Sequence, residues 1–85
     1  MAVKEVALVL EEERKTVDCG ALQRFGLTPR EAEVLHWVTE GKTNRRIGVI
    51  LHATPRTVDK HLERIYAKLR VNTRMAAAVY ARTHA

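Results

Sequence analysis

Cysteine and aromatic residues are scarce in this 85-residue chain, and long apolar runs are missing. The single cysteine, Cys19, rules out an intramolecular disulfide framework, and a reducing compartment such as the cytoplasm fits best. No run approaches the roughly 18 apolar residues of a membrane span, and the apolar run 6–10 is too short for a signal peptide. Because the chain has four aromatic residues, we expect a mainly aliphatic core.

Groupings of catalytic or metal-binding residues are also missing from the sequence. The histidines are far apart and have no cysteine or acidic partner at the spacing of a zinc site: His36, His52, His61 and His84. The sequence pattern offers no general base that would activate the Thr57 hydroxyl, so it gives no support for nucleophilic catalysis. We therefore expect no metal, no cofactor and no enzymatic activity.

Positive charge is concentrated in the second part of the chain, which carries a formal net charge of +5 overall. Residues 1–27 hold four basic and five acidic residues, whereas residues 28–85 hold eleven basic and five acidic ones. Such a basic domain is typical of nucleic-acid binders, although a merely basic soluble surface is the competing interpretation. Charge alone is therefore compatible with a nucleic-acid partner but does not favour one over a merely basic surface.

The pattern of apolar residues predicts an all-α fold, because they recur at three- and four-residue steps and no alternating strand pattern occurs. Residues 2–16 are expected to form a short helix, and residues 17–27 a connection with room for one helical turn. We divide the chain into an N-terminal helix or linker, 1–21, and a domain, 22–85. The first segment is either a helical extension or a tail, and the sequence leaves both open.

Threonines mark the starts of four helices within the domain. Thr28 is followed by Pro29 and Glu31, which is a capping box with proline at the first helical position. Thr54 is likewise followed by a proline, and Thr43 and Thr73 precede further apolar-periodic stretches. The helices predicted from these starts span 29–40, 44–51, 55–69 and 74–82.

Two of these helices, 44–51 and 55–69, are joined by a three-residue turn, which matches a helix-turn-helix. In that motif the second helix enters the major groove, and its N-terminal residues contact base edges. Its apolar face, centred near Val58 and Ile65, leaves a polar and net basic side: Arg56, Thr57, Lys60, Glu63, Arg64 and Ala67. Such a side suits a groove lined by phosphates and base edges.

From Leu27 to Ala81 the sequence closely resembles the LuxR/FixJ-type DNA-binding domain of bacterial transcription regulators. The resemblance is carried by LTPREAEVL at 27–35, GKTN at 41–44, Ile47, TPRTV at 54–58, His61, Ile65, KL at 68–69, Val71 and Arg74. It implies a four-helix domain whose third helix, here about 55–69, reads the major groove. It also implies that the fourth helix often mediates dimerisation on an inverted repeat.

The resemblance assigns roles to individual positions. Thr57 and Lys68 resemble residues that anchor phosphates, and a phosphate contact is expected for Arg45 or Arg46. The base-reading surface is expected around Lys60, with its neighbours Asp59, Glu63 and Arg64. The full set of expected DNA-binding residues is Thr43, Asn44, Arg45, Thr54, Arg56, Thr57, Asp59, Lys60, His61, Glu63, Arg64 and Lys68.

Three departures from the family pattern stand out. Arg46 replaces the usual glutamate, which removes the capping box that Thr43 would form and opposes the helix dipole. Gly48 replaces a small alanine, at a cost of about 0.5–1 kcal/mol in helix propensity. Asp59 and Glu63 are acidic at positions where many family members have basic residues. A carboxylate can accept a hydrogen bond from cytosine N4, but it also repels phosphate.

We therefore expect sequence-specific binding of double-stranded DNA by a cytoplasmic bacterial regulator, with no membrane partner. A homodimer on an inverted repeat is expected, and RNA polymerase is a further candidate partner. The final helix is the expected dimer surface, through Arg74, Ala77, Ala78 and Ala81, although its alanines could equally be ordinary helix formers. The alternative is a protein-interaction module that kept the fold and lost DNA binding, which Gly48 and the two acids would favour.

Overall fold

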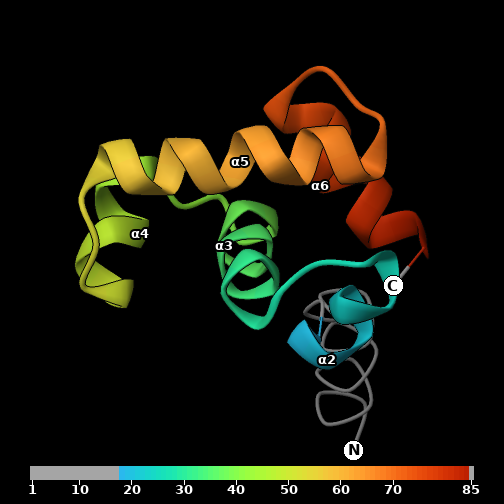
Figure 1. The fold of residues 1–85 in the computed structure, drawn as a ribbon, viewed down its shortest axis with the longest axis horizontal. Coiled ribbons are helices and arrows are strands. Elements are labelled where there is room, and N and C mark those ends of the chain that lie inside the picture. The colour runs from blue at the N-terminus through green and yellow to red at the C-terminus, as the bar shows by residue number, and fades with distance from the viewer. Residues whose placement is uncertain (1–17, 85) are drawn as a thin grey trace, which may run out of the picture.

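The computed structural model describes residues 18–84, and within them every regular element is helical. Figure 1 shows the arrangement of these elements, which are α2 (Cys19–Leu22), the 3-10 helix η1 (Gln23–Phe25), α3 (Pro29–Thr39), α4 (Asn44–Leu51), α5 (Pro55–Leu69) and α6 (Arg74–His84). The predicted all-α class is confirmed, and the four predicted helices of the domain are present. The helix predicted over 2–16 lies outside the described residues.

The predicted threonine caps account for the helix starts. At α3 the capping box is complete, because Thr28 Oγ1 accepts from the Glu31 amide at 3.1 Å and Glu31 Oε1 accepts from the Thr28 amide at 3.0 Å. Thr43, Thr54 and Thr73 each accept one amide hydrogen bond, at 3.2, 3.1 and 3.0 Å respectively. These bonds satisfy amides that have no partner inside their helices.

The helix ends follow the sequence less closely. Gly41 ends α3 with a φ of 80°, as its position after the helix suggested. α4 and α5 instead end at His52 and Arg70, which adopt left-handed backbone with φ of 56° and 59°. α6 runs to His84, two residues beyond the predicted end. The left-handed conformations of His52 and Arg70 could not be predicted, because neither histidine nor arginine is a residue type that favours this conformation.

α5 is the longest helix, and α3, α4 and α6 pack against it (Figure 1). α4 lies against its N-terminal half, α3 crosses its middle, and α6 covers its C-terminal half. The predicted apolar stripe of α5 is buried: Val58, Leu62, Ile65 and Leu69. The core is aliphatic as expected, with the aromatic side chains half-buried around it.

α2 and η1 close the end of the core near α6. Leu22 is fully buried, and the Phe25 and Tyr80 rings meet edge to face with centroids 5.3 Å apart. The Asp18 carboxylate accepts from the Gly20 amide and caps α2. The predicted division between 21 and 22 therefore falls within α2, which is part of the packed body.

The turn between α4 and α5 depends on Gly48. The Ala53 amide donates to Gly48 O at 2.8 Å, which closes the turn tightly. A Cβ atom at Gly48 would lie 2.4 Å from Ala53 O, well inside any normal contact. Gly48, which costs helix propensity, thus allows the backbone of α4 to approach the turn closely.

Candidate nucleic-acid interface

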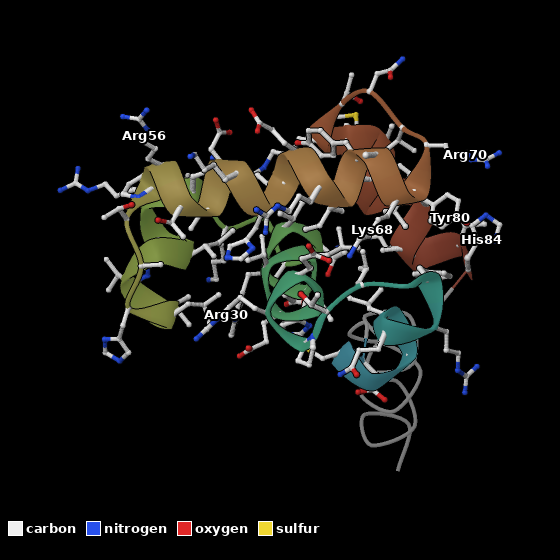
Figure 2. The ribbon with its side chains drawn as sticks, in the orientation of Figure 1. Arg30, Arg56, Lys68, Arg70, Tyr80 and His84 are labelled. Atoms are coloured by element: carbon white, nitrogen blue, oxygen red, sulfur yellow. The ribbon has the colours of Figure 1, made fainter. Side chains whose placement is uncertain are left out.

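The outward side of α5, defined here as Arg56, Thr57, Asp59, Lys60, Glu63 and Arg64, is exposed along the first three turns of the helix. α3, α4 and α6 all pack on the other sides of α5 (Figure 1). Figure 2 shows Arg56 at the N-terminal end of α5, pointing away from the rest of the molecule. The helix therefore presents the polar side that the apolar periodicity predicted.

Charged side chains on this outward side make no hydrogen bond or ion pair within the described part of the chain. Hydrogen bonds and ion pairs within residues 18–84 involve other charged groups, such as Arg30 with Glu33 and Lys68 with Glu31. The outward side itself carries three basic and two acidic side chains that are solvated and available: Arg56, Lys60, Arg64, Asp59 and Glu63. These are groups that can exchange water for phosphates or base edges.

The two threonines at the start of α5 serve the helix itself. Thr54 Oγ1 accepts from the Thr57 amide at 3.1 Å and lies 3.0 Å from Thr57 Oγ1. Thr54 is therefore a capping residue, and its hydroxyl is also the hydrogen-bond partner of Thr57. Both side chains remain exposed, so the Thr57 hydroxyl stays accessible from outside the domain.

The first turn of α4, the helix that precedes α5, adds basic side chains. Arg45 and Arg46 are both exposed, and no acidic residue occupies the first turn of α4. Arg45 also borders an open hollow between α4 and the turn, lined by Val49, His52, Thr54 and Pro55 among others. Thr43 caps α4, and Asn44 accepts a hydrogen bond from Arg74, so both are occupied within the domain.

Lys68 lies apart from the outward side. Figure 2 shows it pointing from α5 toward α3, and its Nζ lies 2.6 Å from Glu31 Oε1. Burial of the Glu31 carboxyl raises its pKa, but the hydrogen bonds from Lys68 and Thr28 outweigh burial and leave the pKa lowered. The side chain predicted to anchor a phosphate is thus the partner of a buried carboxylate.

His61 occupies the flank between the outward side and the core. It is half-buried, and its buried Nδ1 has no hydrogen-bond partner among the described residues. This placement fits the expected packing residue at the edge of the core, and a DNA contact by His61 stays a prediction.

Two residues of the dimer surface predicted on the last helix lie in the core of the chain. Ala77 and Ala81 are fully buried in the chain's own core, because α6 presents its small residues to the helices it packs on. Arg74 is also engaged within the chain, and Ala78 is half-buried. The exposed apolar residues of α6 are Met75 and Val79, which are 76% and 56% exposed and lie one turn apart.

Comparison with known proteins matches residues 26–81 to the family model described as bacterial regulatory proteins, luxR family. The chain belongs to the luxR family. This luxR-family domain is therefore a DNA-binding domain of the transcription-regulator type, and its family is one of regulators rather than enzymes. None of the described helices has the length and apolar character needed to cross a membrane.

Named relatives agree with the family model. The domain is 49% identical over 62 residues to the transcriptional regulatory protein LiaR of Bacillus subtilis, covering 73% of this chain and 29% of LiaR. It is 47% identical over 62 residues to the quorum sensing-dependent regulator RpaR of Rhodopseudomonas palustris, covering 73% of this chain and 26% of RpaR. The chain thus spans less than a third of the length of these relatives. No solved structure matches it.

Proposed function

We propose that this domain binds double-stranded DNA sequence-specifically, with the N-terminal half of α5 in the major groove. The observation that carries the proposal is the outward side of α5, whose charged side chains are exposed and unpaired within the described residues. Elsewhere in the domain, basic side chains such as Lys68, Arg74 and Arg82 donate to partners in the same chain. Exposed and unpaired cations along one helix can displace counterions from phosphates and approach base edges.

The proposal divides the work among the exposed residues. Lys60 and Glu63 lie on the outward side of α5 and face away from the core, so we assign them to base edges. Lysine donates to guanine O6 or N7, and glutamate accepts from cytosine N4. Arg45 and Arg46 lie in the first turn of α4, and Thr57 lies in the first turn of α5. We assign all three to phosphates, which set the register of the helix in the groove.

The same proposal includes a homodimer on an inverted repeat, joined through α6. Met75 and Val79 replace the buried alanines as the dimer contact, because they are the apolar side chains that α6 exposes. Within a bacterial cell the domain would act on DNA in the cytoplasm, and a longer regulator containing it would control transcription. RNA polymerase is a further candidate partner in this proposal.

Titration of the isotopically labelled chain with a mixed-sequence duplex tests the placement of α5. Backbone amide shifts are expected to change at residues 45–46 and 56–64, and to remain unchanged at residues 22–26 on the opposite end of the domain. Binding should weaken steeply as salt rises, because phosphate contacts release counterions. No shift at low salt, or shifts confined to residues outside α4 and α5, would contradict the proposal.

A protein-interaction module is the second candidate, and the unpaired acids Asp59 and Glu63 are the observation that favours it. Two carboxylates on the outward side repel phosphates and would suit a basic protein partner. Replacing both by their amides separates the candidates. On a mixed-sequence duplex, where Glu63 reads no preferred base, DNA affinity should rise or stay constant if the helix lies in the groove, whereas a basic partner protein would lose affinity.

A further inference from the structure

α4 has several features that weaken an isolated helix. It has eight residues, a glycine in its middle, and two arginines in the first turn where the helix dipole favours acids. It packs chiefly on α5 and only slightly on the other helices. The placement of Arg45 and Arg46 therefore depends on whatever holds the start of α4 to the body of the domain.

Arg74 makes that connection. It is the first residue of α6, and its guanidinium donates through Nη1 to the Asn44 side-chain oxygen and through Nη2 to the Lys42 carbonyl. Asn44 is the first residue of α4, and Lys42 lies in the loop before it. Arg74 is also close enough to Tyr66 of α5 to oppose the rise in the Tyr66 pKa that burial causes. One side chain thus joins the starts of α4 and α6 beside α5.

We propose that Arg74 is a positioning residue for DNA binding, which holds the start of α4 so that Arg45 and Arg46 meet the phosphates. The two hydrogen bonds fix both the loop and the first residue of α4, and the rigid fork of a guanidinium defines their relative geometry. Lysine at this position could replace one bond but not both. The inference rests on the proposed function, since it concerns how the domain meets DNA.

Arg82 provides the matched comparison within the same helix. Its guanidinium donates to the Thr39 carbonyl at the end of α3, so it also ties α6 to a backbone carbonyl of another element. It has no hydrogen bond to α4 or to the loop before it. If Arg74 served α6 alone, its replacement and that of Arg82 would have similar consequences.

The experiment compares R74Q, R74K, N44A and R82Q with the parent chain by amide hydrogen exchange and by binding to a mixed-sequence duplex at several salt concentrations. R74Q should speed exchange across residues 45–50 and weaken binding about tenfold, which is the scale of one charge-assisted hydrogen bond. The slope of affinity against salt should fall by about one for each phosphate that the arginines of α4 no longer reach. R74K should recover part of both effects, and R82Q should change neither.

N44A distinguishes positioning from direct contact by Arg74. Asn44 carries no charge, so its replacement can lower the salt slope only by moving the arginines of α4. An unchanged slope in N44A together with a lowered slope in R74Q would overturn the inference and make Arg74 itself a phosphate contact. Equal exchange and equal affinity in R74Q and the parent would overturn it as well. Failure of the parent chain to bind DNA would instead contradict the proposed function, while exchange would still report whether Arg74 holds α4.

Discussion

Lys68 Nζ lies 2.6 Å from Glu31 Oε1, and this ion pair joins the first turn of α3 to the last turn of α5. Glu31 is 2% exposed and also completes the capping box with Thr28. The carboxylate therefore has its charge and its hydrogen bonds satisfied within the domain, which is what makes a buried carboxylate tolerable. The pair orients α5 against α3 and so sets the direction of the outward side.

Replacing Lys68 by methionine should lower the free energy of unfolding by about 1–3 kcal/mol, because Glu31 would lose its cationic partner while remaining buried. The range allows for the partial exposure of Lys68. Urea unfolding measures the change. Lys60→Met is the control, since Lys60 is exposed and unpaired, and it should stay within about 0.5 kcal/mol of the parent. Equal stability of the two variants would show that the ion pair contributes nothing.

The lowered pKa of Glu31 also makes the free energy of unfolding depend on pH. Its pKa is lower in the folded chain than the ordinary value, so the folded state holds the proton less tightly than the unfolded state. The stabilisation is fully present above the unfolded pKa of about 4.3 and is lost as pH falls through the lowered folded value. Thermal unfolding across the acidic range should show this loss, and Glu31→Gln should flatten that part of the profile.

The starts of the helices could be predicted from the sequence because their signals are local. A threonine followed by proline or glutamate contains its own partner amides, as the bonds of Thr28 and Thr54 show. The apolar stripe of α5 is likewise a property of one helix. These signals do not depend on how the helices meet, so the elements and the outward side of α5 followed from them.

Interactions between distant residues could not be predicted in the same way. Lys68 with Glu31, and Arg74 with Asn44, are separated by at least 30 positions, and each pairing depends on how two helices cross. The close approach of Gly48 to Ala53 O could not be predicted either, because the turn and not the local helix places that oxygen. Which side of α6 is buried, and therefore the burial of Ala77 and Ala81, depends on the helices that α6 packs against.

Gly48→Ala should destabilise the domain by about 1–3 kcal/mol, although alanine is the better helix former. The new methyl group would meet Ala53 O at 2.4 Å, and a backbone atom cannot move aside without opening the turn. Val49→Ala, on the exposed side of the same helix, is the control and should change stability by less than about 0.5 kcal/mol. Chemical denaturation decides the matter, and a stabilised Gly48→Ala variant would refute the close-approach account.

Val79→Glu should prevent dimerisation while leaving the fold intact, because Val79 is exposed in the single chain. Sedimentation equilibrium of parent and variant measures the association, with circular dichroism to check helicity. Lys substitution at Ala77 should instead unfold the domain, since a charge there would be buried without a partner. A dimer that survives Val79→Glu would remove α6 as the proposed contact.

Lys60→Ala should cost about 1–3 kcal/mol of binding free energy on the preferred sequence and relax the preference at one base position. Arg46→Ala should weaken binding to all sequences alike and lower the salt slope by about one, as expected for a phosphate contact. Fluorescence anisotropy with the preferred and a scrambled duplex measures both. An equal loss for Lys60→Ala on the two duplexes would reassign Lys60 to the DNA backbone.

The central claim is that the outward side of α5 reads a DNA sequence, and selection from a randomised duplex pool at two salt concentrations tests it most directly. We predict that sequencing of the bound fraction will recover an inverted repeat, with affinity that falls steeply as salt rises. Salt-sensitive binding without an enriched sequence would contradict the assignment of Lys60 and Glu63 to base edges. No binding even at low salt would contradict the claim as a whole and favour a protein partner for the same helix.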